Sequence, residues 1–300
     1  MQVSRFFVRN PWLRRALAMP LALRHRFIEW RQRAGNEVIA RIAEILQGPV
    51  LCKVDEFDGV FSINPRSHLF HRILLAGQYE PRISQLYYSL IRPDADIIDI
   101  GANVGFFTVG GAKRLSTGRL LAAEPTAEGF RRLTENVARN GVSEKVILFK
   151  GMVSQSKGQG NIFFVPGCEE YSSMNKPEHF AVRDREVSSE SVPIECVDDL
   201  VDAYGLHPTV IKVDVEGAEF SVFSGAQHTL LKHRPVVISE LWRGPTRADG
   251  HSGSEIIQML EALNYIVMDP HDPQAKPGQS EISDIICFPK ETYDPSLLKP

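Results

Sequence analysis

The sequence predicts an α/β protein in which helices cover both faces of a mainly parallel sheet. Short apolar runs alternate with helical patterns along most of the chain, which is typical of such sheets. Several of these runs are apolar throughout and end at an acidic residue or a glycine, as expected for strands buried on both faces. Seven runs are predicted to be strands: 96–100, 119–123, 145–150, 210–215, 234–241, 265–268 and 285–288.

The composition fits one α/β domain with an extension. The chain has 300 residues, 43% of them hydrophobic, and a net charge of −3. Residues 1–28 contain six arginines and no acid, so the remaining chain is acidic and nucleic acid is not an expected partner. The four cysteines are far apart, which predicts free thiols in a reducing, cytoplasmic compartment. No apolar run approaches the roughly 20 residues that a membrane-spanning helix needs.

Two regions are expected along the chain. Residues 1–49 form an arginine-rich helical extension, and residues 50–300 form the main domain, with its core at 77–288. Within the extension, residues 1–46 mix arginines with bulky apolar groups. This segment packs on the main domain, lies on an anionic membrane surface or a partner, or acts as an organellar presequence. At the start of the main domain, two β-like runs flank Asp58-Gly59, which predicts a hairpin.

A strand, a glycine turn and a helix start follow one another at residues 96–107. Gly101 allows a sharp turn after the strand, and Gly105 allows close approach of the first helical turn. Such a turn presents free backbone N–H groups, while Asp99 suits an ammonium or a hydroxyl donor, so a zwitterionic ligand is favoured. The Gly-x-Gly-x-x-Gly spacing of nicotinamide enzymes is absent. The residues expected to contact a cofactor here are Asp99, Gly101, Ala102, Asn103, Gly105 and Phe106.

The second strand ends at Glu124, with Pro125 beside it. An acid at this position can accept hydrogen bonds from the hydroxyls of an adenosine ribose, so both residues are candidates for cofactor binding. From Gly158 to Cys196 the chain is predicted to be irregular, apart from a β-like run at 161–165 and a strand at 192–197. Its middle part, which contains His179, is expected to form a loop over the substrate.

Charged residues surround the ends of the fourth and fifth strands. Lys212 and Asp214 alternate along the fourth strand and therefore point the same way, and Glu216 follows them. A buried lysine needs a partner, so Lys212 and Asp214 are expected to form an ion pair. Glu240 ends the fifth strand.

These stretches resemble the FkbM family of class I S-adenosylmethionine-dependent methyltransferases. The glycine turn is similar to the family's motif I, and Lys-Val-Asp-Val-Glu-Gly-Ala-Glu at 212–219 is similar to its second signature, with Gly225-Ala226 after it. Tyr79-Glu80 matches a pair that the family carries before motif I. The run that ends at Ser154 is also family-like, although Gln155 replaces the usual Asp. The resemblance covers roughly residues 77 to 268.

The resemblance implies a Rossmann-like class I methyltransferase fold with an antiparallel last strand and S-adenosyl-L-methionine as cofactor. Glu80 and Ser154 would then join the cofactor-binding residues. The implied acceptor is a hydroxyl of a sugar, a glycolipid or a secondary metabolite. Methyl transfer is an in-line displacement, so the base must lie near the methyl group. The candidate catalytic residues are Asp214, Glu216, Glu240 and Lys212, with His179 as an outside possibility.

Three alternatives stay open at this point. Asp214, Glu216 and Glu240 are oxygen ligands that suit a divalent metal, although no metal is expected. Glu124 alone would also fit a NAD-dependent oxidoreductase. The third alternative is a non-catalytic cofactor-binding or scaffold protein that docks through its arginine-rich N-terminus.

Overall fold

The computed structural model divides the chain into two compact units, residues 1–48 and 49–300. The structure describes residues 45–46, 48–166, 168–173, 186–242, 249–275 and 282–295. The predicted N-terminal extension therefore lies almost wholly outside the described residues, as does His179. The fold below belongs to the second unit.

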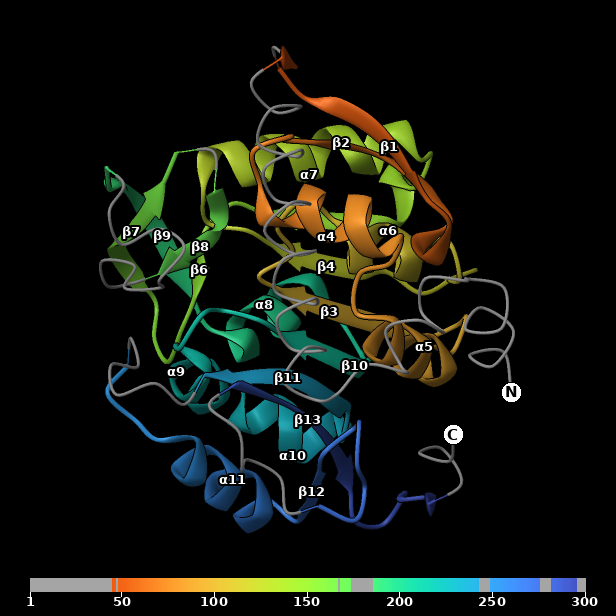
Figure 1. The fold of residues 1–300 in the computed structure, drawn as a ribbon. Coiled ribbons are helices and arrows are strands. Elements are labelled where there is room, and N and C mark those ends of the chain that lie inside the picture. Colours follow the sequence, from red (N-terminus) through yellow and green to blue (C-terminus); the bar gives the residue numbers. More distant parts are fainter. Residues whose placement is uncertain are drawn as a thin grey trace, which may run out of the picture. The chain divides into compact units, whose positions relative to one another are not determined.

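A seven-stranded sheet forms the centre of this unit (Figure 1). Six strands run in the same direction, and β13 runs antiparallel to both of its neighbours, β11 and β12. This confirms the predicted antiparallel last strand. In spatial order the strands are β12 (Tyr265–Met268), β13 (Ile282–Pro289), β11 (Val236–Trp242), β10 (Pro208–Val213), β3 (Asp96–Ile100), β4 (Leu120–Ala123) and β5 (Val146–Phe149).

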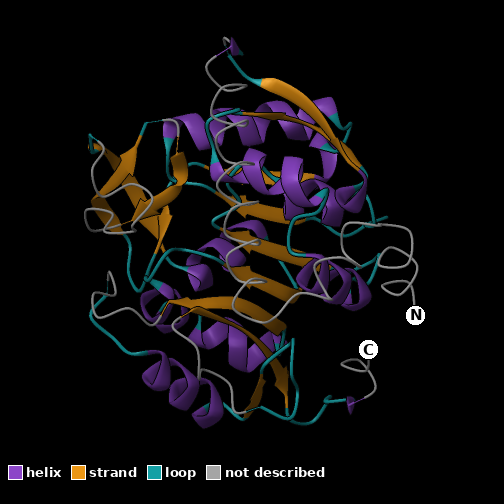
Figure 2. Ribbon diagram, viewed as in Figure 1, coloured by secondary structure: helices purple, strands orange, loops and turns teal. Residues whose placement is uncertain are grey.

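Helices lie on both faces of the sheet (Figure 2). One face packs into a large apolar cluster with the helices of the second half of the chain. These are α8 (Val197–Tyr204), α9 (Glu219–Ser224), α10 (Gln227–His233) and α11 (Gly253–Ala262). The first half of the chain supplies α5 (Pro81–Leu90), α6 (Phe106–Ala112) and α7 (Ala127–Arg139), of which α5 and α6 contact the central strands.

Several of these helices begin at capping residues that the sequence supplies. Ser252 and Glu255 form a capping box at the start of α11. The Thr126 side chain accepts from the backbone N–H of Gly129 at the start of α7. Pro81 opens α5, where its missing N–H would have no partner in any case. Helix α6 is shorter than the pattern at 103–115 predicts, because Asn103 and Gly105 have positive φ and form the turn before it.

The predicted hairpin is present, but its turn differs from the prediction. Strand β1 (Val50–Val54) pairs with β2 (Gly59–Ile63), and Gly59 lies opposite Val54 within the ladder. The connection is a 3₁₀ turn, η1 (Asp55–Phe57), followed by Asp58 in the left-handed region. Asp58 therefore takes the strained turn position and Gly59 belongs to the strand. Helix α4 (His68–Ala76) follows, with Ser67 as its N-cap.

The segment between residues 158 and 196 contains more strand structure than the sequence predicts. After a second 3₁₀ turn, η2 (Ser143–Lys145), and β5, the chain forms a separate four-stranded sheet in the order β6-β9-β7-β8. Its strands are β6 (Met152–Val153), β7 (Gly158–Val165), β8 (Cys168–Ser173) and β9 (Ser188–Glu195). The predicted runs at 161–165 and 192–197 coincide with parts of β7 and β9. The rest of these strands and β8 were not predicted, because glycine and polar residues weaken the β pattern there, whereas pairing between β7 and β9 along their length stabilises them.

Candidate functional site

The sheet register places a row of charged residues on one face. Lys212 lies opposite Asp99 on β3, and Glu240 lies opposite Asp284 on β13. Because side chains alternate along a strand, Asp214 projects on the same side as Lys212, next to the end of β11. The opposite face, with Ile211 and its neighbours, is apolar. The sheet thus has one apolar face, and its other face carries acidic residues at the carboxyl ends of the parallel strands.

Lys212 is the cation at the centre of this row. Its side chain is 6% exposed, and its Nζ lies 3.0 Å from Oδ2 of Asp214. The ammonium also lies 4.8 Å from the centre of the Phe107 ring, which comes from α6. Burial alone would lower the pKa of Lys212, but the charges of Asp214 and Asp99 outweigh it and raise the pKa. The expected ion pair is present, and Lys212 stays charged.

Glu80 adds a further carboxyl group to this row of charged residues, from the segment before α5. It precedes α5 in the left-handed region, with φ 55°, and its Oε1 lies 3.6 Å from Nη1 of Arg72. The same arginine lies over the ring of Tyr79, 4.8 Å from its centre. The family-like pair Tyr79-Glu80 therefore faces the acids that end the parallel strands, and α4 holds it there through Arg72.

The acids of the cluster hold their protons more tightly than isolated carboxyl groups. Burial, followed by the charge of Asp214, raises the pKa of Glu80 to about 7 and that of Glu240 to about 9. Burial also raises the pKa of Asp284, although its hydrogen bond to His271 opposes this. One ammonium therefore faces more carboxylates than it neutralises, and some of them are protonated near neutral pH.

Asp284 and His271 complete the cluster, and the sequence analysis missed both. His271 Nε2 lies 2.5 Å from Oδ2 of Asp284, and a hydrogen bond from Arg82 to the carbonyl of Pro270 fastens the turn that carries His271. Asp284 comes near the start of its strand. An antiparallel strand brings its start to the edge where parallel strands end, and this rule would have identified Asp284 from the sequence.

The glycine turn fits closely against the neighbouring strand. Gly101 has φ 81°, and a Cβ there would lie 1.8 Å from the carbonyl oxygen of Asp214. The expectation of free backbone N–H groups is wrong for most of the turn. Gly101 and Ala102 donate to the carbonyl of Ala123, Asn103 to Oε2 of Glu124, and Gly105 to the carbonyl of Ala102. These bonds fix the turn and leave few of its amides for a ligand.

The remaining predicted cofactor residues lie in different surroundings. Glu124 is 4% exposed and also accepts from the amide and hydroxyl of Thr126, so it shapes the turn as well as lining it. The Phe106 ring stacks on Phe57 with centres 5.1 Å apart, inside an aromatic cluster. Further residues keep their predicted places near the strand ends: Pro125 follows Glu124, Ser154 donates its amide to Glu195, and Glu216 has φ 50° after Asp214.

One observation tests whether an amino-acid ligand fits this site. Oδ2 of Asp99 accepts from the hydroxyl of Thr108 at 2.6 Å, whereas Oδ1 is buried with no hydrogen-bond partner in the structure. Burial raises the pKa of Asp99, so this oxygen gains from an additional donor. The ammonium group of S-adenosylmethionine is such a donor, and the residues present fit this cofactor.

The described residues offer neither a metal centre nor a membrane span. No group of three or more His, Cys, Asp or Glu residues is arranged to hold a metal ion. Likewise, none of the described helices has the length and apolar character needed to cross a bilayer.

The fold and this site define a class I S-adenosylmethionine-dependent methyltransferase. Residues 99–267 match the model of the methyltransferase FkbM domain, and the chain belongs to that family. The match includes the glycine turn, Glu124 and the 212–219 signature, which agrees with the resemblance inferred from the sequence. Family membership favours methyl transfer over the oxidoreductase and non-catalytic alternatives.

Curated relatives match the chain at low identity. Methyltransferase sdnD from Sordaria araneosa is 28% identical over 170 residues, which cover 49% of this chain and 66% of sdnD. Hexuronic acid methyltransferase AglP from Haloferax volcanii is 26% identical over 197 residues, covering 64% of this chain and 74% of AglP. AMB antimetabolite synthetase AmbE from Pseudomonas aeruginosa is 32% identical over 85 residues, covering 28% of this chain and only 4% of AmbE.

Solved structures show a similarly distant relationship. Methyltransferase FkbM from Methylobacillus flagellatus KT is 14% identical, with a TM-score of 0.42, covering 73% of this chain and 52% of that protein. A SAM-dependent O-methyltransferase from Thermotoga maritima is also 14% identical with a TM-score of 0.42, covering 81% of this chain and 78% of that protein.

Proposed function

We propose that this methyltransferase transfers the methyl group to an oxygen of a small polar acceptor, a sugar hydroxyl being the first candidate. The observation that carries the proposal is the group of carboxyl groups around Lys212 at the strand ends. Asp214, Glu240, Glu80 and Asp284 supply carboxyl oxygens, and burial raises the pKa of Glu80 to about 7 and that of Glu240 to about 9, so the group can both donate and accept hydrogen bonds. Sugar hydroxyls need partners of this kind.

The relatives support a polar acceptor. The name of AglP states that it acts on hexuronic acid, and sdnD is named only as a methyltransferase. A glycan, a glycolipid or a secondary metabolite with sugar-like hydroxyls would fit the same acids. Nucleic acid is not proposed as a partner, because the acidic edge would repel its phosphates.

The roles of the site residues follow from their surroundings. Bound S-adenosylmethionine supplies an electrophilic methyl group, held by the glycine turn, Asp99, Glu80 and Glu124. Glu240 and Asp214 orient the acceptor hydroxyl, and whichever of them is ionised takes its proton. Lys212 fixes Asp214 through their ion pair. Asp284 and His271 offer a route by which that proton reaches solvent, since the His271 side chain is half exposed.

The test measures methyl transfer from isotope-labelled S-adenosylmethionine to a panel of monosaccharides, hexuronic acids and glycolipids. Product mass and nuclear magnetic resonance then identify the methylated atom. We expect an O-methyl product whose rate falls about 10²–10⁴-fold in Glu240→Gln or Asp214→Asn, as is typical when a positioned base is lost. Transfer to nitrogen or carbon alone would contradict the proposal.

A matched control separates loss of chemistry from loss of structure. Glu144→Gln removes an exposed carboxylate outside the site and leaves the rate unchanged. Titration with S-adenosylhomocysteine then reports whether each variant keeps its cofactor site. Parent-like rates in both Glu240→Gln and Asp214→Asn would remove these carboxylates from the mechanism.

A further inference from the structure

Arg132 is a buried cation that the proposed reaction does not use. It lies in the second turn of α7, and its side chain is only 7% exposed. Its Nη2 lies 2.6 Å from Oε1 of Glu128, one turn earlier on the same helix. The Nε and Nη1 atoms are buried and have no hydrogen-bond partner in the structure. Three of the five guanidinium N–H groups therefore have no acceptor.

The single ion pair of Arg132 is shared. Both oxygens of Glu128 also accept from Arg131, at 2.7 and 2.8 Å, and Arg131 makes a further bond to Glu135. The hydrogen bond from Arg131, then the charge of Arg132, lowers the pKa of Glu128. Glu128 therefore stays ionised but divides its charge between two guanidinium groups. A buried cation in this state has much to gain from a further anion.

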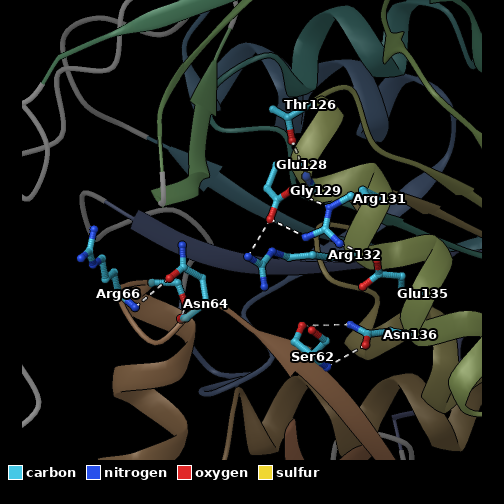
Figure 3. Close-up of polar contacts among 11 residues, drawn as sticks. Ser62, Asn64, Arg66, Thr126, Glu128, Gly129, Arg131, Arg132, Glu135 and Asn136 are labelled. Atoms are coloured by element: carbon cyan, nitrogen blue, oxygen red, sulfur yellow. Dashed lines mark hydrogen bonds and ion pairs between the residues drawn. The ribbon is translucent and has the colours of Figure 1, made fainter. Parts of the chain in front are cut away.

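The segment that Arg132 approaches supplies no carboxylate. Figure 3 shows Arg132 extending from α7 toward the segment that carries Asn64 and Arg66. That segment ends at Ser67, the N-cap of α4, and residues 64–67 include no acidic residue. The three N–H groups of Arg132 without an acceptor therefore gain no charged partner from this segment.

We propose that Arg132 binds an anionic group, a carboxylate or a phosphate, of a small-molecule ligand. Guanidinium groups favour both anions because several N–H groups can point to one group of oxygens. The site is separate from the carboxylates around Lys212, which repel anions. Arg132 lies one helical turn after Gly129. A Cβ built on Gly129 would lie 2.6 Å from Oε1 of Glu124, the residue expected to bind the ribose.

The test is calorimetric titration of the full chain, saturated with S-adenosylhomocysteine, at constant ionic strength. Inorganic phosphate, glucuronate and uncharged glucose are the three probes, and the first two distinguish a phosphate from a carboxylate ligand. We expect binding of at least one anion and none of glucose. In Arg132→Met, which keeps the side-chain length and removes the charge, the affinity falls about 10-fold or more.

Two further variants fix the interpretation. Arg139→Met removes an exposed arginine from the last turn of the same helix and leaves anion binding unchanged. Glu128→Gln removes the competing carboxylate, so anion binding becomes tighter, an effect that damage to the fold would not produce. Absence of anion binding in the parent, or equal affinity in the parent and Arg132→Met, overturns the proposal. Saturation with S-adenosylhomocysteine is measured first, so failure of the cofactor site is seen separately.

Discussion

Gly101 shows how one residue adjusts the distance between two strands. Its positive φ turns the chain after β3, and the missing Cβ leaves room for the carbonyl oxygen of Asp214. The backbone N–H of Asp214 in turn donates to the carbonyl of Ile100 at 2.9 Å. A candidate catalytic acid is therefore positioned by direct backbone contact with the cofactor turn.

Replacing Gly101 by Ala is expected to destabilise the protein severely. A left-handed backbone costs an L-residue roughly 1–2 kcal/mol, and overpacking against backbone adds about 1–3 kcal/mol. Gly141→Ala is the matched control, because Gly141 has φ 69° but open space around its Cβ position. Urea denaturation should show a loss for Gly101→Ala about 1–3 kcal/mol larger than the loss for Gly141→Ala. Equal losses would show that the contact with Asp214 is unimportant.

At the scale of elements, two asparagines of α7 fasten the hairpin to the main domain. Asn136 is fully buried; its side chain accepts from the amide of Ser62 at 2.7 Å and donates to the carbonyl of Val104 at 2.8 Å. Asn140 makes a similar pair of bonds to the backbone of Val60. In the structure they join β2, α7 and the glycine turn.

The Asn136→Ala variant is expected to lose about 2–5 kcal/mol of unfolding free energy. The substitution leaves a buried donor and a buried acceptor without partners, and each such loss costs about 1–3 kcal/mol. Asn140→Ala, whose bonds are partly exposed, should lose about 1 kcal/mol. Chemical denaturation measures both values. A smaller loss for Asn136→Ala than for Asn140→Ala would mean that burial does not set the strength of this junction.

Across the whole domain, the raised pKa values of the acid cluster link stability to pH. The folded protein holds protons on Glu80 up to about pH 7 and on Glu240 up to about pH 9, whereas the unfolded chain releases them near the ordinary value of 4.5. The unfolded state therefore binds fewer protons in this window. The unfolding free energy then falls as pH rises, by up to about 1.4 kcal/mol per pH unit for each such proton.

Thermal unfolding between pH 5 and pH 9 tests this linkage. We expect the contribution of these acids, which is fully present only below the unfolded pKa of 4.5, to be largest at pH 5 and to be lost as the pH rises through their folded pKa values of about 7 and about 9. Glu240→Gln should flatten the pH dependence and be more stable than the parent at pH 9. Glu144→Gln, in an exposed position, should keep the parent's slope. An unchanged slope in Glu240→Gln would show that Glu240 is an ordinary ionised carboxylate.

Local pattern was sufficient for most of the architecture. Each central strand is a short apolar run with a distinct end, and the alternation along 210–215 placed Lys212 and Asp214 on one side. The glycine turn and Glu124 could be identified from the sequence because few residue types satisfy the backbone conformation of the turn and the charge needed at position 124. These features depend on neighbours in sequence, so the sequence by itself determined them.

Tertiary structure alone decided the features that depend on distant partners. Strands β7 and β9 pair across more than twenty residues, and the β-like runs at 161–165 and 192–197 do not by themselves indicate that the two segments pair. Asp284 enters the acid cluster through the antiparallel register of β13, and His271 through a turn fastened by Arg82. Register, burial and charge balance are properties of the folded neighbourhood, and a single sequence contains no direct record of them.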